Sequence, residues 1–303
     1  MKVAVLMGGN SAEREVSLQS GQAVVGALQS ASIDLLDCIY EGDIKAYLSQ
    51  LAEADVVFIA LHGGEGENGE VQKVFDAEGI VYTGSGPEAS ALAMDKNSSK
   101  LLMVENELPT PRWHFFENGD QADPDSGGDL GYPLVVKPNG EGSTVGLSIV
   151  RSETDLLPAI EKADGCGSGV ILEQYIPGRE LTVGILGGDE ALPCIEIVPS
   201  HDHYDYECKY TSGMSHYVCP ADLPAALASQ LSQTSLAMHE ILGCRHYSRI
   251  DFRLSPENSF YCLEVNTLPG LTDTSLVPKA AAEVGISFEQ LIVKLCRMAL
   301  NGD

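Results

Sequence analysis

The first third of the chain alternates short apolar runs with segments of helical period, and the apolar runs end at glycine. Residues 3–7 (VAVLM) stop at GGNS, and residues 54–61 (ADVVFIAL) stop at HGGEGENGE. Further strands are expected over 33–39 and 80–82, and helices over 13–28 and 71–78. Because the strands are apolar on both faces and helices separate them, the pattern predicts a doubly wound parallel sheet over about residues 1–95. Ligands of such sheets bind at the loops that follow the strands.

The rest of the chain mixes strands and helices without an internal repeat. A helix expected over 91–106 ends before the sequence LPTP, and a polar loop follows over 118–131. The elements expected next are strands over 134–137, 147–150 and 170–173 and a helix over 153–163. Beyond residue 181 they are further strands, a helix over 224–242, paired strands over 250–254 and 260–265, and a closing helix over 287–301. These breaks predict three modules, 1–95, 96–180 and 181–303, in a combined α/β and α+β organisation.

The chain is strongly acidic, since 18 Lys and Arg against 44 Asp and Glu give a formal charge of −26. The average surface therefore repels nucleic acid and anionic membrane faces, and we expect neither as a partner. A nucleotide ligand would need local Lys or Arg side chains and bound divalent cations to reverse this field.

Cysteine usage and the N-terminus both point to the cytoplasm. The 8 cysteines are scattered without a CxxC pair, which is typical of buried free thiols in a reducing compartment. The apolar run at residues 3–7 is too short for a signal peptide, and no run approaches the roughly 18 apolar residues of a membrane span. We therefore expect a cytoplasmic protein.

A lysine and a glycine-rich loop follow the strand expected over 134–137. The sequence is KPNGEGSTVG from Lys137 to Gly146, and glycine occupies three of the seven positions 140–146. Glycine lets backbone N–H groups approach an anion closely, so the loop is expected to cover phosphates. An ordinary hairpin loop is the alternative, and a P-loop is excluded because no Gly-Lys-Ser/Thr follows.

A second polar segment, EQYIPGRE, runs from Glu173 at the end of an expected strand to Glu180. Recognition of adenine and ribose requires a strand edge, an apolar wall and an acceptor for sugar hydroxyls. These residues could supply all three. Taken alone, the segment is better explained as a solvated linker with surface charges.

Asp251 and the sequence Glu264-Val265-Asn266 place oxygen ligands on two strands that are expected to pair. Side chains two residues apart share a face of a strand, so Glu264 and Asn266 point together, and Asp251 joins them with Arg249 from the neighbouring strand. Such oxygens suit Mg²⁺, with water and phosphate completing its octahedron. The alternative, a polar face held by cross-strand contacts, is disfavoured because carboxylates among apolar neighbours need partners.

Three features are ambiguous from their residues alone. The loop HDHYDYECKY, from His201 to Tyr210, has two alternate histidines but no third ligand, so it is either a surface loop or a lid that brings Lys209 and Tyr210 over a site. Glu13 stands in the first turn of the first helix, where a carboxylate commonly only complements the helix dipole. His62, before two glycines, is equally open.

Seven strings of sequence in a fixed order identify a family. They are GGNSAEREVSLQSG, ALHGGEGENGEVQ, TGSG, MDKNSSK, VVKPNGEGSTVG, RIDF and LEVNTLPGLTDTSLVPKAA. In this order, over nearly the whole chain, they resemble the D-alanine–D-alanine ligases of the ATP-grasp superfamily. The resemblance implies a Rossmann-like module over 1–95 and a two-part ATP-grasp unit, with the phosphate loop in 96–180 and the magnesium and substrate sites in 181–303.

The resemblance also implies an ATP site between the central and C-terminal modules, with two Mg²⁺ ions that Mn²⁺ could replace. The residues implied for ATP are Lys96, Lys137 and Lys209 at the phosphates, Glu173, Gln174, Tyr175 and Ile176 at adenine, and Glu180 near the ribose. The metal ligands implied are Asp251, Glu264 and Asn266.

For the substrates, the resemblance implies two D-alanine molecules. Glu13 would anchor the amino group of the first, with Ser143 and Tyr210 in a linked hydrogen-bond network. The residues implied for the oxyanion are Arg249 and the backbone N–H of Gly270, and those implied for substrate contacts are His62, Ser275 and Leu276. In this family the enzyme is commonly a homodimer.

The implied reaction joins the two D-alanines through a D-alanyl phosphate, for peptidoglycan precursor synthesis. Phosphoryl transfer depends on positioning and charge neutralisation, so no nucleophilic Ser or Cys is required. Two alternatives stay open: a related ligase whose second substrate is D-serine or D-lactate, and a nucleotide-binding homologue that has lost catalysis. Tyr210 disfavours D-lactate, because in the family a tyrosine there goes with D-alanine and a phenylalanine with D-lactate.

Overall fold

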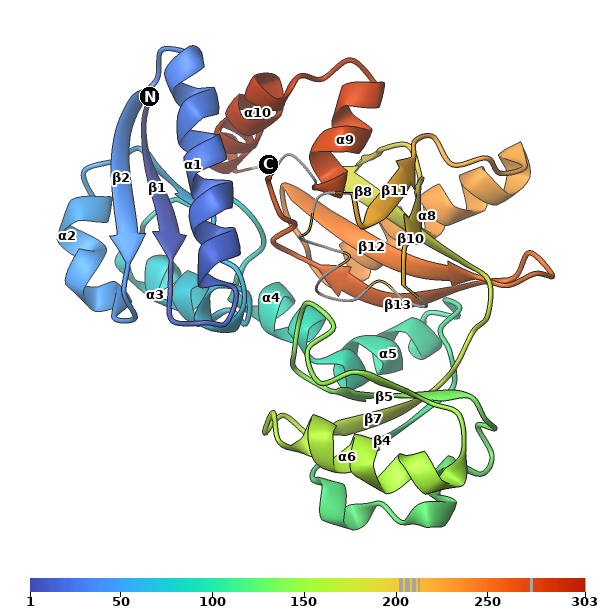
Figure 1. The fold of residues 1–303 in the computed structure, drawn as a ribbon. Coiled ribbons are helices and arrows are strands. Elements are labelled where there is room, and N and C mark those ends of the chain that lie inside the picture. The colour runs from blue at the N-terminus through green and yellow to red at the C-terminus, as the bar shows by residue number, and fades with distance from the viewer. Residues whose placement is uncertain (202–203, 205–207, 209–210, 212, 273–274, 303) are drawn as a thin grey trace.

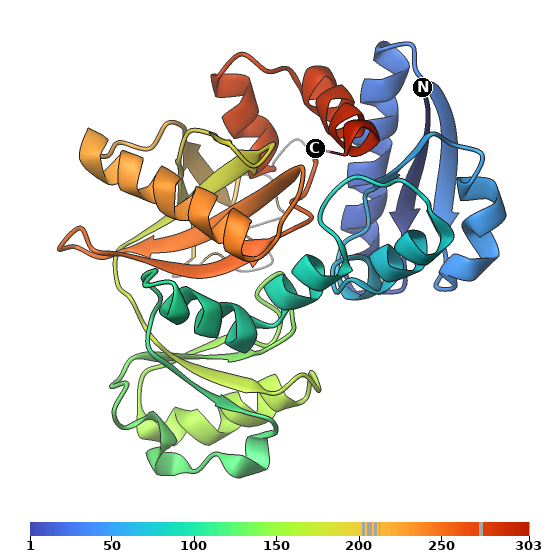
Figure 2. The same cartoon turned by 180° about the vertical axis from the view of Figure 1, so that it is seen from behind.

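The computed structural model describes residues 1–201, 204, 208, 211, 213–272 and 275–302. The chain forms three bodies (Figure 1): an N-terminal sheet with its helices, a small central module at the bottom of the view, and a larger C-terminal sheet. The closing helix packs back against the N-terminal body, as the view from behind in Figure 2 also shows.

The N-terminal sheet is parallel and has the strand order β2-β1-β3. Its strands are β1 (Lys2–Gly8), β2 (Asp34–Tyr40) and β3 (Val56–Ile59), and its helices are α1 (Arg14–Ser30), α2 (Leu48–Leu51) and α3 (Glu70–Glu78). Residues 3–7 in β1 are 0% exposed, which confirms the expected strand covered on both faces. The edge strand β2 is only partly buried.

The strand expected over 80–82 is wrong, because these residues make only an isolated bridge between Val57 and Tyr82. Val57 donates to the carbonyl of Val81 at 2.8 Å and accepts from the N–H of Thr83 at 3.0 Å. The side-chain hydroxyl of Thr83 then accepts from the N–H of Ile59 at 3.2 Å. Since a side chain takes the place of the next backbone acceptor, the ladder ends there.

The single helix expected over 91–106 is in fact two helices, α4 (Pro87–Met94) and α5 (Lys96–Glu105). Asp95 stands between them in an extended conformation, and its carboxylate accepts a hydrogen bond from the N–H of Ser98 at 2.7 Å. This cap satisfies a backbone N–H that a helix start leaves without a partner. The break makes Lys96 the first residue of α5.

The central module is an antiparallel sheet in the order β4-β7-β5-β6. Its elements are β4 (Trp113–Phe116), β5 (Leu134–Pro138), β6 (Ser148–Val150), β7 (Val170–Gln174) and α6 (Leu156–Asp164). The last three strands and the helix confirm the prediction, whereas β4 is not among the expected strands. Its four residues, WHFF, do not alternate between apolar and polar, so the period of a strand is not visible in the sequence.

The C-terminal sheet has the order β11-β10-β8-β12-β13, and β9 pairs with β8. Its elements are β8 (Arg179–Leu186), β9 (Glu190–Ala191), β10 (Ile195–Pro199), β11 (Ser215–Val218), β12 (Tyr247–Leu254), β13 (Phe260–Asn266), α8 (Ala225–Ile241) and α9 (Leu276–Glu283). The expected pairing of β12 and β13 is confirmed, with Asp251 opposite Glu264 and Arg249 opposite Asn266. Short 3₁₀ turns lie at Ile44–Tyr47, Gly64–Gly66, Gly119–Gln121, Pro124–Gly127 and Glu153–Asp155.

The closing helix α10 (Phe288–Asn301) belongs in space to the N-terminal body. Its fully buried side chains Leu291, Leu295 and Cys296 join the core around β1 and α1. The end of the chain therefore ties the C-terminal module to the first sheet. The boundaries 1–95, 96–180 and 181–303 stay a prediction.

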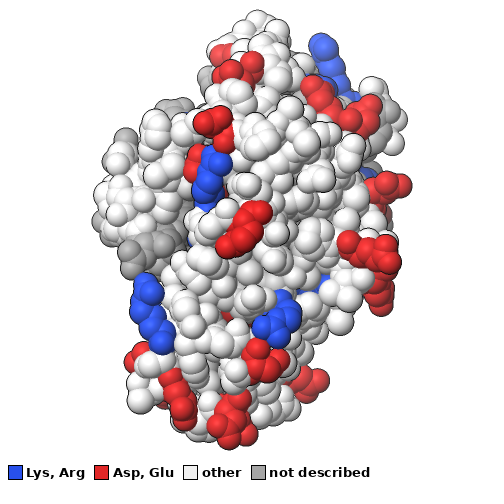
Figure 3. Space-filling view, turned by 90° about the vertical axis from the view of Figure 1, so that its right-hand side faces the viewer, with Lys and Arg blue, Asp and Glu red and all other residues white. Residues whose placement is uncertain are grey.

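The surface agrees with the acidic composition. Acidic side chains are spread over the face in Figure 3, and basic ones are few and scattered. Among the described residues, none of the helices combines the length and apolar character that crossing a bilayer requires.

Candidate active site

Two cavities meet where the three bodies come together. The first holds the predicted site residues Glu13, His62, Ser143, Arg249, Asn266, Gly270, Ser275 and Leu276. The second holds Lys137, Glu173, Gln174, Tyr175, Ile176, Glu180 and Asp251. Lys96 and Glu264 line both cavities, so the two are joined at these side chains.

The structure therefore gathers every predicted site residue that it describes. Lys209 and Tyr210 lie outside the described residues. These side chains lie together in the structure, but the role of each one stays a prediction. Lys96, Lys137, Arg249 and Arg253 line the cavities, but acidic side chains still outnumber them there, so a nucleotide would also need bound cations.

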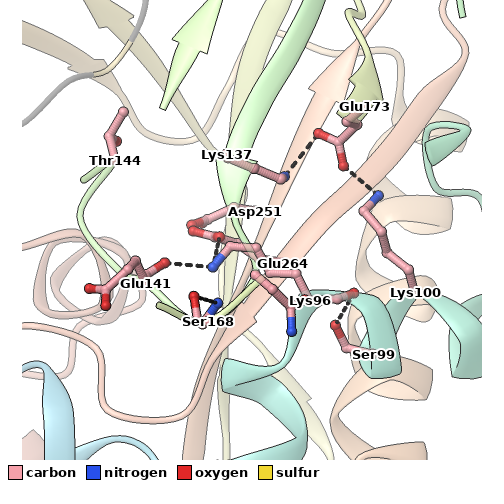
Figure 4. Close-up of polar contacts among 12 residues, drawn as sticks. Lys96, Ser99, Lys100, Lys137, Glu141, Thr144, Ser168, Glu173, Asp251 and Glu264 are labelled. Carbon is pink, nitrogen blue, oxygen red and sulfur yellow. Dashed lines mark hydrogen bonds and ion pairs between the residues drawn. The ribbon is translucent and has the colours of Figure 1, made fainter. Parts of the chain in front are cut away.

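One buried carboxylate in the second cavity is held by two lysines (Figure 4). Glu173, near the end of β7, accepts a hydrogen bond from Lys137 Nζ at 2.9 Å through Oε1. Its Oε2 lies 2.6 Å from Lys100 Nζ in an ion pair. Burial alone would raise the pKa of Glu173, but the two ammonium groups outweigh it and hold the pKa below its usual value.

Lys96 lines both cavities, and Figure 4 shows its side chain beside those of Glu141 and Glu264. Its Nζ donates to the backbone carbonyl of Glu141 at 2.6 Å and lies 3.7 Å from Glu264 Oε2. Lys96 thus links the start of α5 to the glycine-rich loop and to β13. Burial raises the pKa of the Glu141 carboxyl, and the nearby Glu13 adds to this rise against the opposing effect of Lys96.

Arg253 organises the predicted ribose end of the second cavity. Its Nη1 lies 3.4 Å from Glu180 Oε2, and its Nε and Nη2 donate to the carbonyls of Ile176 and Gly178 at 3.1 and 2.9 Å. The guanidinium also lies 6.0 Å from the centre of the Tyr175 ring, which is within the range of a cation–π contact. The turn after β7 is therefore fixed on β12 by one arginine.

The carboxylate of Asp251, on β12, accepts three hydrogen bonds from two side chains. Arg249 donates to both of its carboxylate oxygens, at 2.9 and 2.7 Å, and Thr182 donates to Oδ1 at 2.6 Å. Burial alone would lower the pKa of Arg249, but the Asp251 carboxylate outweighs it and raises the pKa. These bonds hold the carboxylate in the wall of the second cavity.

The predicted metal ligands contribute two carboxylates and one amide. Asp251 and Glu264 are directly opposite each other in the β12–β13 register. Asn266 Oδ1 accepts from the N–H of Leu268 at 2.8 Å, which fixes the amide. Over the described ranges, no three His, Cys, Asp or Glu side chains gather as a metal site. A metal here would need oxygen ligands from its substrates as well.

In the first cavity, Glu13 contacts Ser143 by a hydrogen bond from the serine hydroxyl. Glu13 is 7% exposed and precedes α1, whereas Ser143 lies in the glycine-rich loop. Ser143 and Thr144 have φ of 48° and 63°, a left-handed conformation that is uncommon outside glycine. The loop is therefore turned so that Ser143 faces the N-terminal module.

Histidine and serine side chains complete the walls of this cavity. His62 Nε2 lies 2.9 Å from Ser20 Oγ, and its Nδ1 lies 3.4 Å from Glu67 Oε1. Ser275, which precedes α9, accepts from the N–H of Thr272 at 2.8 Å through its hydroxyl. These contacts hold side chains from the N-terminal and C-terminal parts of the chain in the wall of the first cavity.

Several residues of the site are not among the predicted ones. Glu67, Tyr204 and Arg253 line the cavities, and Lys100 pairs with Glu173. Lys100 had a signal, since it follows Lys96 by four residues and so lies on the same side of a helix. Tyr204 sits in a loop crowded with polar and aromatic residues, where nothing in the pattern distinguishes one tyrosine from another.

Known proteins are similar to this sequence over nearly its whole length. The family model described as D-ala D-ala ligase C-terminus matches residues 102–297, and that described as D-ala D-ala ligase N-terminus matches residues 39–85. The D-alanine–D-alanine ligase of Syntrophotalea carbinolica is 44% identical over 294 residues, which are 97% of this chain and 94% of that protein.

Solved structures share the whole fold. The D-alanine–D-alanine ligase from Bacillus anthracis complexed with ATP matches with a TM-score of 0.88 at 33% identity, over 100% of this chain and 97% of that one. The VanG D-Ala:D-Ser ligase from Enterococcus faecalis matches with a TM-score of 0.84 at 30% identity, over 98% and 99%.

A parallel α/β body followed by two antiparallel sheets with a cavity between them defines an ATP-grasp ligase. Within this class, the matched family models and the identity to curated relatives are decisive. The chain belongs to the D-alanine–D-alanine ligase family.

Proposed function

We propose that the protein joins two D-alanine molecules to D-alanyl-D-alanine while ATP is converted to ADP and phosphate. The observation that carries this function is the union of the two cavities. One is lined by groups suited to a nucleotide, the other by groups suited to an amino acid, and Lys96 and Glu264 stand where they meet. A reaction between the two ligands would take place there.

The second cavity fits ATP. Glu173, Gln174, Tyr175 and Ile176 line it, and together they offer polar groups and apolar surface to adenine. Lys137 and Lys96 supply positive charge for the phosphates. Glu180, placed by Arg253, supplies a carboxylate for the ribose hydroxyls. A relative of the same fold was solved with ATP, which supports this assignment.

Mg²⁺, or Mn²⁺, fits beside these phosphates. Asp251, Glu264 and Asn266 offer hard oxygen ligands, which these ions prefer. In the part of the chain that the structure describes, no third carboxylate joins Asp251 and Glu264 to enclose an ion, and Mg²⁺ commonly takes only one or two from a protein together with phosphate oxygens and water. When bound, two such ions would neutralise phosphate oxygens and polarise the transferred group.

The first chemical step activates a carboxylate. Glu13 would hold the ammonium group of the first D-alanine, so that its carboxylate oxygen faces the terminal phosphorus of ATP. That oxygen forms a bond to phosphorus as the bond to the ADP oxygen breaks, giving D-alanyl phosphate and ADP. Lys96 and Lys137 would offset the charge on the transferred group, which is the main requirement of phosphoryl transfer.

The second step forms the peptide bond. The amine of the second D-alanine, held beside Ser275 and Leu276, attacks the acyl carbon, loses a proton and displaces phosphate. The negative charge on the carbonyl oxygen would be met by the Arg249 guanidinium and the backbone N–H of Gly270, both in the wall of the first cavity. Arg249 is kept in place by its two bonds to Asp251.

Water must be kept from the acyl phosphate, since water would hydrolyse it. The glycine-rich loop is tied across the site by Ser143 to Glu13, and Thr144 Oγ1 donates to the carbonyl of Tyr204 at 3.0 Å. Two loops that belong to different modules thereby meet over the joined cavities.

The choice of second substrate is tested by phosphate release with a panel of D-amino acids, L-amino acids and D-hydroxy acids. We expect D-alanine to give the fastest release, accompanied by dipeptide. A D-Ala:D-Ser ligase shares this fold, so faster release with D-alanine plus D-serine would replace the proposed acceptor. No release with any of them would indicate a homologue without catalysis.

The proposed product also bears on the pathway and the cellular compartment of the enzyme. We propose that the dipeptide enters peptidoglycan precursor synthesis in the cytoplasm, that the enzyme works as a homodimer, and that the modules 1–95, 96–180 and 181–303 are its units. The proposed Tyr210 and Lys209 contacts, with the substrate network and a phosphate, belong to this same function.

A further inference from the structure

Lys100 is a buried lysine that has no role in the reaction steps proposed above. It lies in α5 and is 0% exposed. Its ammonium contacts Glu173 Oε2 at 2.6 Å, donates to Thr110 Oγ1 at 2.7 Å and lies 5.3 Å from the centre of the Trp113 ring. Burying an ammonium is costly unless it is paired, and burial accordingly lowers the pKa of Lys100. Lysine side chains are rarely buried this completely, so the position of Lys100 needs a physical explanation.

The cluster around Glu173 carries an excess of positive charge. Two ammonium groups, of Lys100 and Lys137, face one carboxylate, which leaves one positive charge in a buried setting. Lys137 lines the second cavity and Lys100 does not, so the excess is presented to the cavity by Lys137. An anionic phosphate group is the natural complement of this charge.

Without Lys100, Glu173 would depend on Lys137 alone. If Lys137 then turned its ammonium toward a phosphate, a buried carboxylate would lose its positive partner, which is strongly unfavourable. With Lys100 present, Glu173 stays paired while Lys137 changes partner. The two lysines divide the two oxygens of the carboxylate between them, which suits this exchange.

We propose that Lys100 is a positioning residue that neutralises Glu173 and thereby makes Lys137 available to the phosphates of the nucleotide. The proposal rests on the proposed function, because it explains how ATP is bound there. Lys100 touches neither the nucleotide nor the reacting atoms and acts through Glu173.

The same lysine is linked to the strand of the proposed metal site. Thr110, which accepts from Lys100, donates to the carbonyl of Cys262 at 2.9 Å, and the N–H of Cys262 donates to the carbonyl of Pro109 at 2.8 Å. Cys262 lies in β13, two residues before Glu264. Lys100 therefore connects the carboxylate of β7 with the strand that carries Glu264, on the two sides of the second cavity.

The test compares the affinities of ATP and adenosine for the full chain by calorimetry. Lys100→Met keeps an apolar stem but removes the charge. We expect it to weaken ATP binding at least about tenfold and to leave adenosine within about twofold, because only the phosphates depend on Lys137. Equal loss of both affinities would indicate a purely structural role and overturn the proposal.

A double-mutant cycle tests whether Lys100 acts through Glu173. In a Glu173→Gln background no carboxylate needs neutralising, so adding Lys100→Met is expected to change the ratio of ATP to adenosine affinity by less than about threefold. An undiminished effect in that background would overturn the proposal. The double variant restores the original excess of one positive charge at Lys137.

A milder variant keeps the test decisive should Lys100→Met not fold. Thr110→Val removes the hydroxyl that orients Lys100 and retains its charge, so we expect the affinity ratio to fall in the same direction by about twofold to fivefold. An unchanged ratio in a folded Thr110→Val protein would contradict the proposal. Dipeptide formation by the unchanged protein is measured separately, so a failure of the proposed ligation is distinguished from a failure of this inference.

Discussion

Ser143 of the central module donates a hydrogen bond to the carboxylate of Glu13, 130 positions earlier in the chain. The contact joins the glycine-rich loop to the start of the first helix. The side chain proposed to hold the substrate ammonium is thus the one that anchors the loop over the phosphates. We infer that amino acid binding and loop position are coupled through this pair.

Ser143→Ala should therefore weaken binding of the first D-alanine and slow the reaction. We expect the KM for D-alanine to rise about tenfold, as the loss of a hydrogen bond to a charged group implies, with a smaller change in the KM for ATP. Steady-state kinetics measure both. Ser152→Ala is the matched control, since Ser152 is exposed and lies outside both cavities. Unchanged D-alanine kinetics in Ser143→Ala would refute the coupling.

Glu264→Gln tests the proposed metal site. The change keeps the shape of the side chain and removes its charge beside the phosphates, so phosphate release should be abolished while the fold stays intact. A coupled phosphate assay and circular dichroism measure the two effects. Glu161→Gln, at an exposed position of α6, should behave like the unchanged protein. Normal turnover of Glu264→Gln would remove the metal assignment.

Tyr210→Phe tests the residue proposed to set acceptor preference. Removing the hydroxyl while keeping the ring should shift the preference from an amine toward a hydroxy acid, as the family pattern implies. Competition between D-alanine and D-lactate, with both products quantified, gives the ratio. The same ratio in both proteins would count against a role of Tyr210 in this choice.

His239 gives the stability of the protein a predictable pH dependence. It lies in α8, is 3% exposed, and its Nδ1 lies 2.7 Å from Oγ of Ser248 in β12. Burial lowers the pKa of His239 from 6.5 to about 4. Between these values the unfolded chain binds a proton that the folded protein does not, so stability falls as the pH falls.

The free energy of unfolding should drop by about 2 kcal/mol from pH 7 to pH 5 because of this one group. Urea denaturation at the two pH values measures the change. His239→Gln cannot titrate, so its loss over the same interval should be smaller by that amount. An equal loss in both proteins would show that His239 is not responsible.

Much of the fold could be predicted because its strands are marked by local pattern. The run at residues 3–7 is apolar on both faces, and β12 and β13 flank a short turn, so both were legible from sequence. The strand expected over 80–82 is wrong because a single hydroxyl, that of Thr83, ends the ladder. The division of α4 from α5 depends on the cap made by Asp95, which a helical period of apolar residues does not reveal.

The site was predictable where motifs end strands or carry a family pattern. Asp251, Glu264 and Asn266 lie together because pairing of β12 and β13 follows from their sequence. Lys100 escapes the same reasoning, since its importance arises from a carboxylate on β7 that is distant in sequence. Contacts of this kind are set by how modules pack, which no local spacing encodes.

The central claim, that ATP makes a carboxylate reactive by phosphorylating it, is tested most directly by isotope transfer. D-alanine labelled with ¹⁸O in its carboxylate is incubated with the enzyme, ATP and Mg²⁺, and the released phosphate is examined by mass spectrometry. The account predicts one ¹⁸O atom in each phosphate formed together with dipeptide, because a carboxylate oxygen leaves with the phosphoryl group. Dipeptide formation with unlabelled phosphate would contradict it.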